Sequence, residues 1–376
     1  MQAGSTLRGG AGALLDGAAL GLSGGGYRAS LFHLGALWRL NEIGWLKRLK
    51  RVDGVSGGAI VAAWLGLRWS RLRFSPAGVA ENFAPDIAAP LRRLAAQVLD
   101  IPVGIAALVL PVSILPGILG SRLFGRTTLA DLQDGPGAPA VGVLATNLLS
   151  GSLVEFTAAG IRDDKLGEYP CPGFSLATAV AASCSVPPTF RPIPLRLRPG
   201  GWRGECPPRF ARTRCQGVPL RLVDGGNLDN HALSVIGGRF NTVLMSDGSS
   251  PVYPWTWLNG DWLTSSLRSN RVMIDHVRSL RIELLGTLAE YVAERRFVRW
   301  GIMDGVEEPR EYALPCPPEV TERLGFLRTR MGRHTAREQG QLINWGYMAC
   351  DAVMRGSVAP EAAPPAAWPI PEWPLG

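Results

Sequence analysis

Residues 18–67, which read AALGLSGGGYRASLFHLGALWRLNEIGWLKRLKRVDGVSGGAIVAAWLGL, decide the fold. A short apolar run ends at a triple glycine, and apolar residues then recur at helical spacing from Arg28 to about Ile43. A second apolar segment ends in the turn Gly54–Gly58, and the apolar run Ala59–Leu67 follows. The order strand, glycine loop, helix, strand, sharp turn, helix predicts two parallel strands joined by a crossover helix.

The rest of the chain continues this alternation. Strand-like runs occur at Gly142–Asn147, Leu153–Thr157, Leu220–Val223 and Thr242–Met245, and helical patterns at Leu176–Ala182 and Asn270–Met303. Alternating strands and helices favour one α/β domain with a mostly parallel sheet, in which functional residues gather at the carboxyl ends of strands. We expect a catalytic domain over residues 1–350, with a lid-like apolar insertion at about 85–125 and a helical C-terminal part at about 255–350. A Pro-rich flexible tail is expected at 351–376.

The bulk composition narrows the partners and the compartment. The net charge is +8, and because only three lysines occur, nearly all of the positive charge is arginine. A basic protein favours anionic partners, but the arginines are scattered and no zinc-finger spacing accompanies them, so we expect anionic membrane and no nucleic acid. The six cysteines form no CxxC pair, and the N-terminus has no secretory pattern. We therefore expect reduced thiols and a cytoplasmic protein.

The turn Gly54–Gly58 matches G-x-S-x-G and makes Ser56 a candidate nucleophile. A nucleophile on a tight strand-to-helix turn needs small neighbours, which Gly54, Gly57 and Gly58 supply. At a helix N-terminus, the backbone N–H groups favour developing negative charge. The alternative interpretation is a glycine-rich turn with a serine helix cap.

The triple glycine Gly24, Gly25 and Gly26 ends the first predicted strand and exposes backbone N–H groups without side-chain obstruction. Acyl transfer develops an oxyanion that preorganised N–H donors stabilise, so these residues are a candidate oxyanion hole. Arg28 adds a positive charge and a candidate phosphate contact. A phosphate-binding loop is the alternative, although neither G-x-G-x-x-G nor G-K-[ST] occurs here.

A serine nucleophile needs a general base. The histidines are His33, His231, His276 and His334, and His231 follows Asp224 by seven residues. Ser56 stands too early in the chain for an ordinary α/β hydrolase triad. Asp224 ends an apolar strand before Gly225 and Gly226, and burial there raises a carboxyl pKa and makes a better base near neutral pH. Asp247 and Asp53 are rival carboxylates.

Four motifs in order resemble those of the patatin-like phospholipases. They are Ser23–Arg28, Gly54–Gly58, the segment Ala182–Pro192 and Asp224–Gly226, and Thr146-Asn147 resembles a strand often seen before the third. The resemblance implies a three-layer α/β/α fold with a mostly parallel central sheet.

The same resemblance implies roles for single residues. Ser56 would be the nucleophile and Asp224 the general base of a dyad without histidine. Gly24, Gly25 and Gly26 would form the oxyanion hole, and the supporting residues would be Arg28, Gly54, Gly57, Gly58, Gly225 and Gly226. No metal and no cofactor are implied. Ala29 departs from the family pattern, since many members have glycine after the basic residue.

The expected function is lipid acyl hydrolysis of the phospholipase A or lysophospholipase type, with a phospholipid or other acyl lipid as substrate. Ile101–Gly120 carries no charge and is long enough to span a bilayer. A single span there would put Ser56 and Asp224 on opposite sides of the membrane, so we expect a buried or lipid-touching lid and peripheral membrane contact. The alternatives are a soluble esterase or transacylase with the same dyad, and a non-catalytic nucleotide- or phosphate-binding sensor.

Overall fold

The computed structural model describes residues 14–132, 135, 137–250, 252, 254, 261–292, 295–305 and 314–376. The strands are β1 Leu15–Leu22, β2 Leu49–Val55, β3 Ala140–Asn147, β4 Ser152–Thr157, β5 Gly160–Asp163, β6 Gly167–Pro170, β7 Ile193–Leu195, β8 Leu220–Asp224, β9 Phe240–Asp247 and β10 Arg296–Gly301. The helices are α1 Gly26–Glu42, α2 Gly57–Arg68, α3 Ala89–Ala95, α4 Asp100–Val109, α5 Leu115–Leu119, α6 Leu176–Ser183, α7 Pro208–Cys215, α8 Leu233–Ile236, α9 Trp262–Tyr291, α10 Pro318–Gly325 and α11 Ala336–Ser357.

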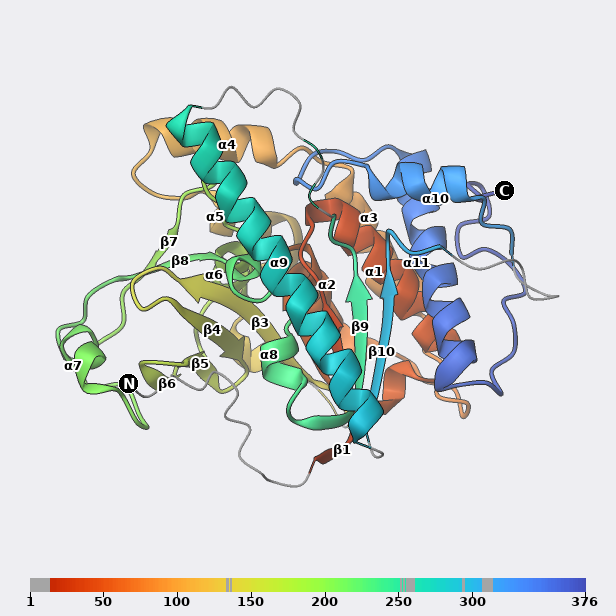
Figure 1. Ribbon diagram of the computed structural model, residues 1–376, viewed down its shortest axis with the longest axis horizontal. Helices are drawn as coiled ribbons and strands as arrows, with labels where there is room; N and C mark the ends of the chain where they lie inside the picture. The colour runs from red at the N-terminus through yellow and green to blue at the C-terminus, as the bar shows by residue number, and fades with distance from the viewer. Residues whose placement is uncertain are drawn as a thin grey trace.

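One sheet runs through the molecule in the order β10-β9-β1-β2-β3-β4-β5-β6, and β8 adds to β3 with β7 beside it. The central strands β10, β9, β1, β2 and β3 are parallel, and the pairings beyond β3 are antiparallel. Helices α8 and α9 cover one face, whereas α1, α2 and α11 lie on the other (Figure 1). The predicted three-layer α/β/α fold with a mostly parallel central sheet is confirmed.

The strand β1 shows why its sequence reads as an unbroken apolar run. Leu20 and Leu22 belong to the core on the side of α1, and Ala19 belongs to the core on the side of α8 and α9. Successive side chains of a strand point to opposite faces, so a strand covered on both faces is apolar throughout. The buried strand ends at Leu22, so the polar residues that follow it lie at the edge of the sheet.

The segment between α2 and β3, which includes the stretch expected to be a lid-like insertion, contains α3, α4 and α5. Its uncharged run is divided between α4 and α5, because Pro111 follows the end of α4 and Pro116 opens α5. In the described part of the chain, no helix combines the length and the apolarity that crossing a bilayer requires.

The helix predicted over Asn270–Met303 is wrong at both ends. It begins earlier, at Trp262, and ends at Tyr291, after which Arg296–Gly301 forms β10. In β10 the buried Val298 and Trp300 alternate with the half-buried Phe297 and Arg299, a period of two that fits a strand and not a helix.

The predicted flexible tail is also corrected. Its expected start at residue 351 lies inside α11, which continues to Ser357. The irregular segment after α11 packs along that helix, where the Asn344 side chain bonds the backbone of Ile370 and Trp373. Ile370 and Leu375 are buried, so apolar contact and amide hydrogen bonds hold a segment whose composition alone indicated flexibility.

Candidate functional site

The strand register brings the serine turn and the Asp-Gly-Gly turn to one edge of the sheet. Val55, the last residue of β2, pairs with Leu144 of β3, and the next residue of β3, Ala145, pairs with Asp224 of β8. Because β4 occupies one edge of β3, β2 and β8 share the other edge, and Asp224 of β8 pairs at the position directly after the end of β2, next to Ser56. The sequence predicts that these two turns lie close together, and this register gives the reason.

Ser56 occupies the turn in a conformation that few residues adopt. Its φ is 52° and its ψ is −117°, and it shares a positive φ with Ala232 alone among the described non-glycine residues. The side chain is only 6% exposed, and the backbone N–H donates to Ser183 Oγ at 2.8 Å. A serine held in such a sparsely populated region is typical of a functional turn.

This conformation predicts a difference between two variants that both lack the hydroxyl group. Glycine adopts a positive φ without penalty, whereas alanine keeps the strain of serine. We expect Ser56→Gly to exceed Ser56→Ala in free energy of unfolding by about 1 kcal/mol, measured by urea denaturation. An alanine variant as stable as the glycine variant would mean that the turn is unstrained.

The glycines around Ser56 are required by close backbone approach. A Cβ atom at Gly54 would collide with the backbone of Gly58, one at Gly57 with the Gly26 carbonyl, and one at Gly58 with the Leu22 carbonyl. The loop after β1 therefore lies directly against the first turn of α2. Gly57 opens α2, so its N–H belongs to the turn that has no acceptor within the helix.

The triple glycine lies beside the serine, but its three N–H groups are not equivalent. A Cβ atom at Gly24 would stand 3.3 Å from Ser56 Cβ, and the Gly24 N–H already donates to the Asn230 carbonyl at 3.1 Å. The N–H groups of Gly25 and Gly26 have no acceptor among the described residues. Both residues have positive φ, 147° and 61°. These two N–H groups are therefore the better donors for an oxyanion.

The side chain of Arg28, two residues after Gly26, lies in the protein interior. It is fully buried and donates to the carbonyls of Gly248 at 2.8 Å, Leu327 at 3.0 Å and Gly325. The predicted phosphate contact of Arg28 is wrong, because the guanidinium is enclosed by the protein's own acceptors. Ala29, which departs from the family pattern, is buried with its methyl group against Gly248, where no side chain competes for the space.

Asp224 is 5% exposed, and burial raises its pKa from 3.8 to about 6. The Gly226 N–H, which donates to Oδ1 at 2.7 Å, and the nearby Ser56 hydroxyl both oppose this rise. Oδ2 has no well-aligned hydrogen bond to any described group, that of Ser56 included. The Asp224 N–H donates to the Ser185 carbonyl at 3.0 Å, which fixes the start of the turn. Asp224 thus offers a free carboxylate oxygen near the serine.

Both glycines after Asp224 are needed for the turn. A Cβ atom at Gly225 would collide with the Leu144 carbonyl, and one at Gly226 would stand 2.7 Å from Asn230 Oδ1. Glycine is therefore required sterically at both positions, and neither residue supplies a reacting group.

The rival base Asp247 is engaged elsewhere. Its carboxylate lies 3.1 Å from His231 Nε2 and 3.1 Å from Arg299 Nη2. Despite burial, these charges hold the pKa of Asp247 well below its usual value. The His231 ring contacts the Asp247 carboxylate and not Ser56.

Asp53, the third carboxylate, lies within an ion-pair cluster. Arg51 Nε stands 2.6 Å from Asp53 Oδ2, and burial nevertheless raises the pKa of Asp53 to about 6. Of the three carboxyl groups, Asp224 is the one whose pKa the Ser56 hydroxyl influences. The structure thus brings Asp224, and not its rivals, to the serine.

The remaining histidines do not join the site. His33 is buried between Ser246 Oγ at 2.7 Å and the Ser23 carbonyl at 2.9 Å, and burial lowers its pKa to about 4. His276 is exposed on α9, and burial lowers the pKa of His334 to about 4 as well. His33 is a neutral structural residue beneath the glycine loop.

Sequence reasoning missed three residues that surround the serine. Ser183 accepts from the Ser56 N–H, Cys184 is a fully buried thiol beside the Ser56 hydroxyl, and Asn230 lies against Gly24. Burial raises the pKa of the Cys184 thiol well above its usual value, so it stays protonated. Ser183 and Cys184 lie in a segment that the family resemblance had marked. No local sequence pattern around Asn230 indicates that this residue lies near the serine.

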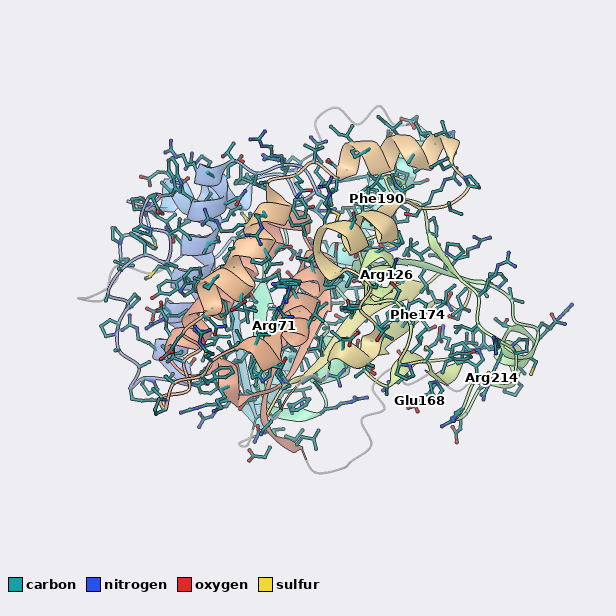
Figure 2. All side chains as sticks on the ribbon, turned by 180° about the vertical axis from the view of Figure 1, so that it is seen from behind. Arg71, Arg126, Glu168, Phe174, Phe190 and Arg214 are labelled. Atoms are coloured by element: carbon teal, nitrogen blue, oxygen red, sulfur yellow. The ribbon has the colours of Figure 1, made fainter. Side chains whose placement is uncertain are left out.

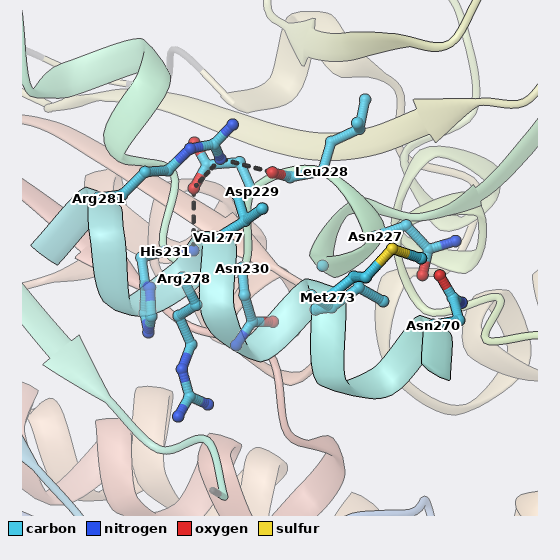
Figure 3. A pocket seen from close by; sticks show the side chains of 12 residues that line it. Asn227, Leu228, Asp229, Asn230, His231, Asn270, Met273, Val277, Arg278 and Arg281 are labelled. Carbon is cyan, nitrogen blue, oxygen red and sulfur yellow. Dashed lines mark hydrogen bonds and ion pairs between the residues drawn. The ribbon is translucent and has the colours of Figure 1, made fainter. Parts of the chain in front are cut away.

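A cavity of about 260 Å³ lies between the loop after Asp224 and α9 (Figure 3). Gly226 and Asn230 belong both to its wall and to the surroundings of the candidate dyad. Its two arginines are held by the protein: Arg281 Nη1 lies 3.2 Å from Asp229 Oδ1, and Arg278 Nη2 lies 2.7 Å from Asp275 Oδ1. The charged side chains of the cavity wall are therefore paired, and most of its lining surface is apolar, from Leu228, Met273, Ile274 and Val277.

One protein-family model and several solved structures are similar to this chain. Residues 20–235 match a family model described as patatin-like phospholipase, a range that contains every residue assigned above to the serine and its surroundings. No curated protein sequence matches the chain. Human GIVD cytosolic phospholipase A2 is similar over 91% of this chain and 59% of its own, with a TM-score of 0.53 and 14% identity. VipD from Legionella pneumophila is similar over 90% of this chain and 66% of its own, with a TM-score of 0.37 and 15% identity. The chain thus spans about three-fifths of the length of the human phospholipase, and at this identity the likeness concerns the fold.

Proposed function

The chain belongs to the patatin-like phospholipase family, because the family model covers residues 20–235, and from this membership we propose that it is a lipid acyl hydrolase of the phospholipase A or lysophospholipase type. The observation that carries the proposal is the pairing of Ser56, on a strained turn at a helix start, with the buried carboxyl of Asp224. The glycine loop beside Ser56 carries two backbone N–H groups, of Gly25 and Gly26, that have no acceptor in the described part of the chain.

In the first half of the proposed reaction, Asp224 Oδ2 accepts the proton of the Ser56 hydroxyl, and the alkoxide attacks the carbonyl carbon of a lipid ester. The oxyanion of the tetrahedral intermediate is held by the N–H groups of Gly25, Gly26 and Gly57. The intermediate collapses when Asp224 returns its proton to the departing alcohol. The lyso-lipid or glycerol moiety leaves, and the acyl chain remains on Ser56.

In the second half, water enters and Asp224 removes its proton as it attacks the acyl carbonyl. The same N–H groups hold the second oxyanion, and the proton returns to Ser56 as the fatty acid leaves. Each step needs one base that alternates between proton acceptor and donor. A pKa of about 6 suits Asp224 to both roles near neutral pH.

The alternative of a phosphate- or nucleotide-binding sensor is disfavoured by Arg28. Arg28 was the candidate phosphate contact of such a loop, but its guanidinium donates to three backbone carbonyls in the interior and does not face a ligand. A soluble esterase or transacylase would use the same dyad, so substrate experiments must separate those two activities from lipid hydrolysis.

The test of the proposed function is fatty acid release from mixed phospholipid vesicles by the purified protein, with the products identified by mass spectrometry. Release of a fatty acid and a lysophospholipid supports the proposal. Hydrolysis of short soluble esters without release from vesicles would replace it by a soluble esterase. No hydrolysis of either substrate, together with no reaction of Ser56 with a fluorophosphonate, would contradict the enzymatic proposal.

The pKa of Asp224 predicts the pH dependence of the reaction. Only the carboxylate form accepts the serine proton, so kcat/KM for a soluble ester should be half-maximal near pH 6, level off about one unit above it and fall about tenfold per pH unit well below it. Circular dichroism at each pH separates loss of the base from loss of the fold. A profile that is still flat at pH 4.5, or a midpoint near 7 that indicates histidine, would contradict Asp224 as the base.

A further inference from the structure

The helix α4 exposes an aliphatic face to solvent. Ile101 is 56% exposed, Ile105 60%, Leu108 82% and Val109 74%, and Val112 in the turn after the helix is 56% exposed. The spacing of the first four residues, i, i+4, i+7 and i+8, places them on one side of the helix. We call these five residues the α4 stripe. Contiguous exposed aliphatic surface of this kind marks an interaction site more often than a solvated surface.

The opposite side of α4 holds the helix against the body of the protein. Val103 is 1% exposed, and the Leu99 and Asp100 N–H groups both donate to the Met331 carbonyl. Near the other end, Arg191 Nε donates to the Ala107 carbonyl at 2.5 Å. The stripe is therefore presented by a helix fixed at both ends and does not result from a helix that lacks a packing partner.

The stripe also lies close to the candidate dyad. The segment that carries Arg191 begins at Ser185, whose carbonyl accepts the Asp224 N–H at 3.0 Å. Within this segment Val186 is 43% exposed, and the Thr189 carbonyl lies 3.9 Å from where a Cβ atom would stand at Gly104 of α4, so the segment connects the Asp224 turn with α4. In Figures 1 and 2, α4 lies at the end of the molecule toward which the parallel strands point, and Phe190 is labelled beside it.

Two arginines lie at the ends of the stripe. Arg191 is exposed at the carboxyl end of α4, and Arg330, 66% exposed, pairs with Asp100 at the amino end at 3.0 Å. Apolar residues flanked by cations fit the boundary between lipid headgroups and acyl chains of an anionic membrane. A second copy of the chain fits less well, because its arginines would meet those of the first copy.

We propose that the α4 stripe inserts into an anionic lipid surface and holds the entrance of the Ser56–Asp224 site against the membrane. The inference rests on the proposed function, since a lipid ester would then pass from the bilayer to the serine without crossing water. Composition alone predicts membrane contact for the protein as a whole, and this inference assigns that contact to α4.

The experiment compares partition onto sedimented vesicles of phosphatidylcholine with phosphatidylglycerol and onto vesicles of phosphatidylcholine alone. The test variant is Leu108→Gln with Val109→Gln, because both side chains are largely exposed and neither belongs to the core. The matched control is Leu15→Gln, 55% exposed at the start of β1, the end of that strand farthest from the glycine loop. We expect the double variant to lose at least tenfold in partition onto the anionic vesicles and the control to bind like wild type.

Fluorophosphonate labelling of Ser56 and hydrolysis of a short soluble ester should be unchanged in the double variant, since neither residue contacts the dyad. Equal partition of the double variant and wild type, or no vesicle binding by wild type, would overturn the inference. Equal binding of wild type to both vesicle types, without weakening by salt, would overturn the selection for anionic lipid. If wild type binds through α4 but hydrolyses no ester, the proposed function fails while the inference stands.

Discussion

Ser56→Ala is expected to abolish ester hydrolysis, with a loss in kcat of about 10⁴-fold or more, and to eliminate labelling by a fluorophosphonate. The loss is large because the hydroxyl forms the acyl intermediate, and no other described group occupies its place between the glycine loop and Asp224. The residual rate would come from the N–H groups and from substrate binding. The measurement is release of fatty acid or of a chromogenic alcohol beside wild type at equal concentration.

The matched control for this loss is Ser185→Ala. Ser185 is also fully buried near the dyad, but its hydroxyl donates back to the Ala181 carbonyl of α6 at 2.7 Å and takes no part in the proposed reaction. We expect Ser185→Ala to retain labelling, and peptide mass spectrometry of the labelled wild type to find the phosphonate on Ser56. Labelling of another serine in both proteins would contradict the assignment of the nucleophile.

The turn around Ser56 could be predicted from sequence because its requirements are local. A strained turn between a strand and a helix needs glycine wherever backbones approach, and Gly54, Gly57 and Gly58 meet backbone atoms where a Cβ atom would stand. The glycine signature therefore survives in a single sequence, and the strand–helix–strand order around it was enough to predict the parallel sheet.

The partners of the loop could not be predicted, because contacts between distant parts of the chain decide them. Gly24 and Gly25 look identical in sequence, yet the Asn230 carbonyl engages the N–H of Gly24 alone. Arg28 looks like a free cation until the carbonyls of Gly248 and Leu327 surround it. Likewise an uncharged run does not tell whether its aliphatic side chains are buried, and in α4 Leu108 and Val109 are not.

Asp224→Asn is expected to lower kcat/KM about 10³-fold or more, because an amide accepts no proton from the serine. The geometry should survive, since the amide oxygen still accepts from the Gly226 N–H. Hydrolysis of a soluble ester measures the loss. A variant that keeps a tenth or more of the wild-type rate would mean that another group is the base.

The same substitution should stabilise the protein at neutral pH. Burial raises the folded-state pKa of Asp224 to about 6 from 3.8, so ionisation opposes folding, with a cost that is absent below about pH 4 and complete above about pH 6. Asp224→Asn removes this cost, and we expect its free energy of unfolding to exceed that of wild type at pH 7 by on the order of 2 kcal/mol and to match it near pH 4.

The buried Asp163 offers the opposite case. Its carboxylate accepts hydrogen bonds from Asn147, Ser152 and the Lys165 N–H, so Asp163→Asn should destabilise the protein at pH 7. Urea denaturation of the two variants at pH 7 separates a carboxylate bound into the structure from one kept partly unpaired for proton transfer. If Asp224→Asn is also destabilising at pH 7, the fold holds the Asp224 carboxylate as a structural group, and it is not available as a general base.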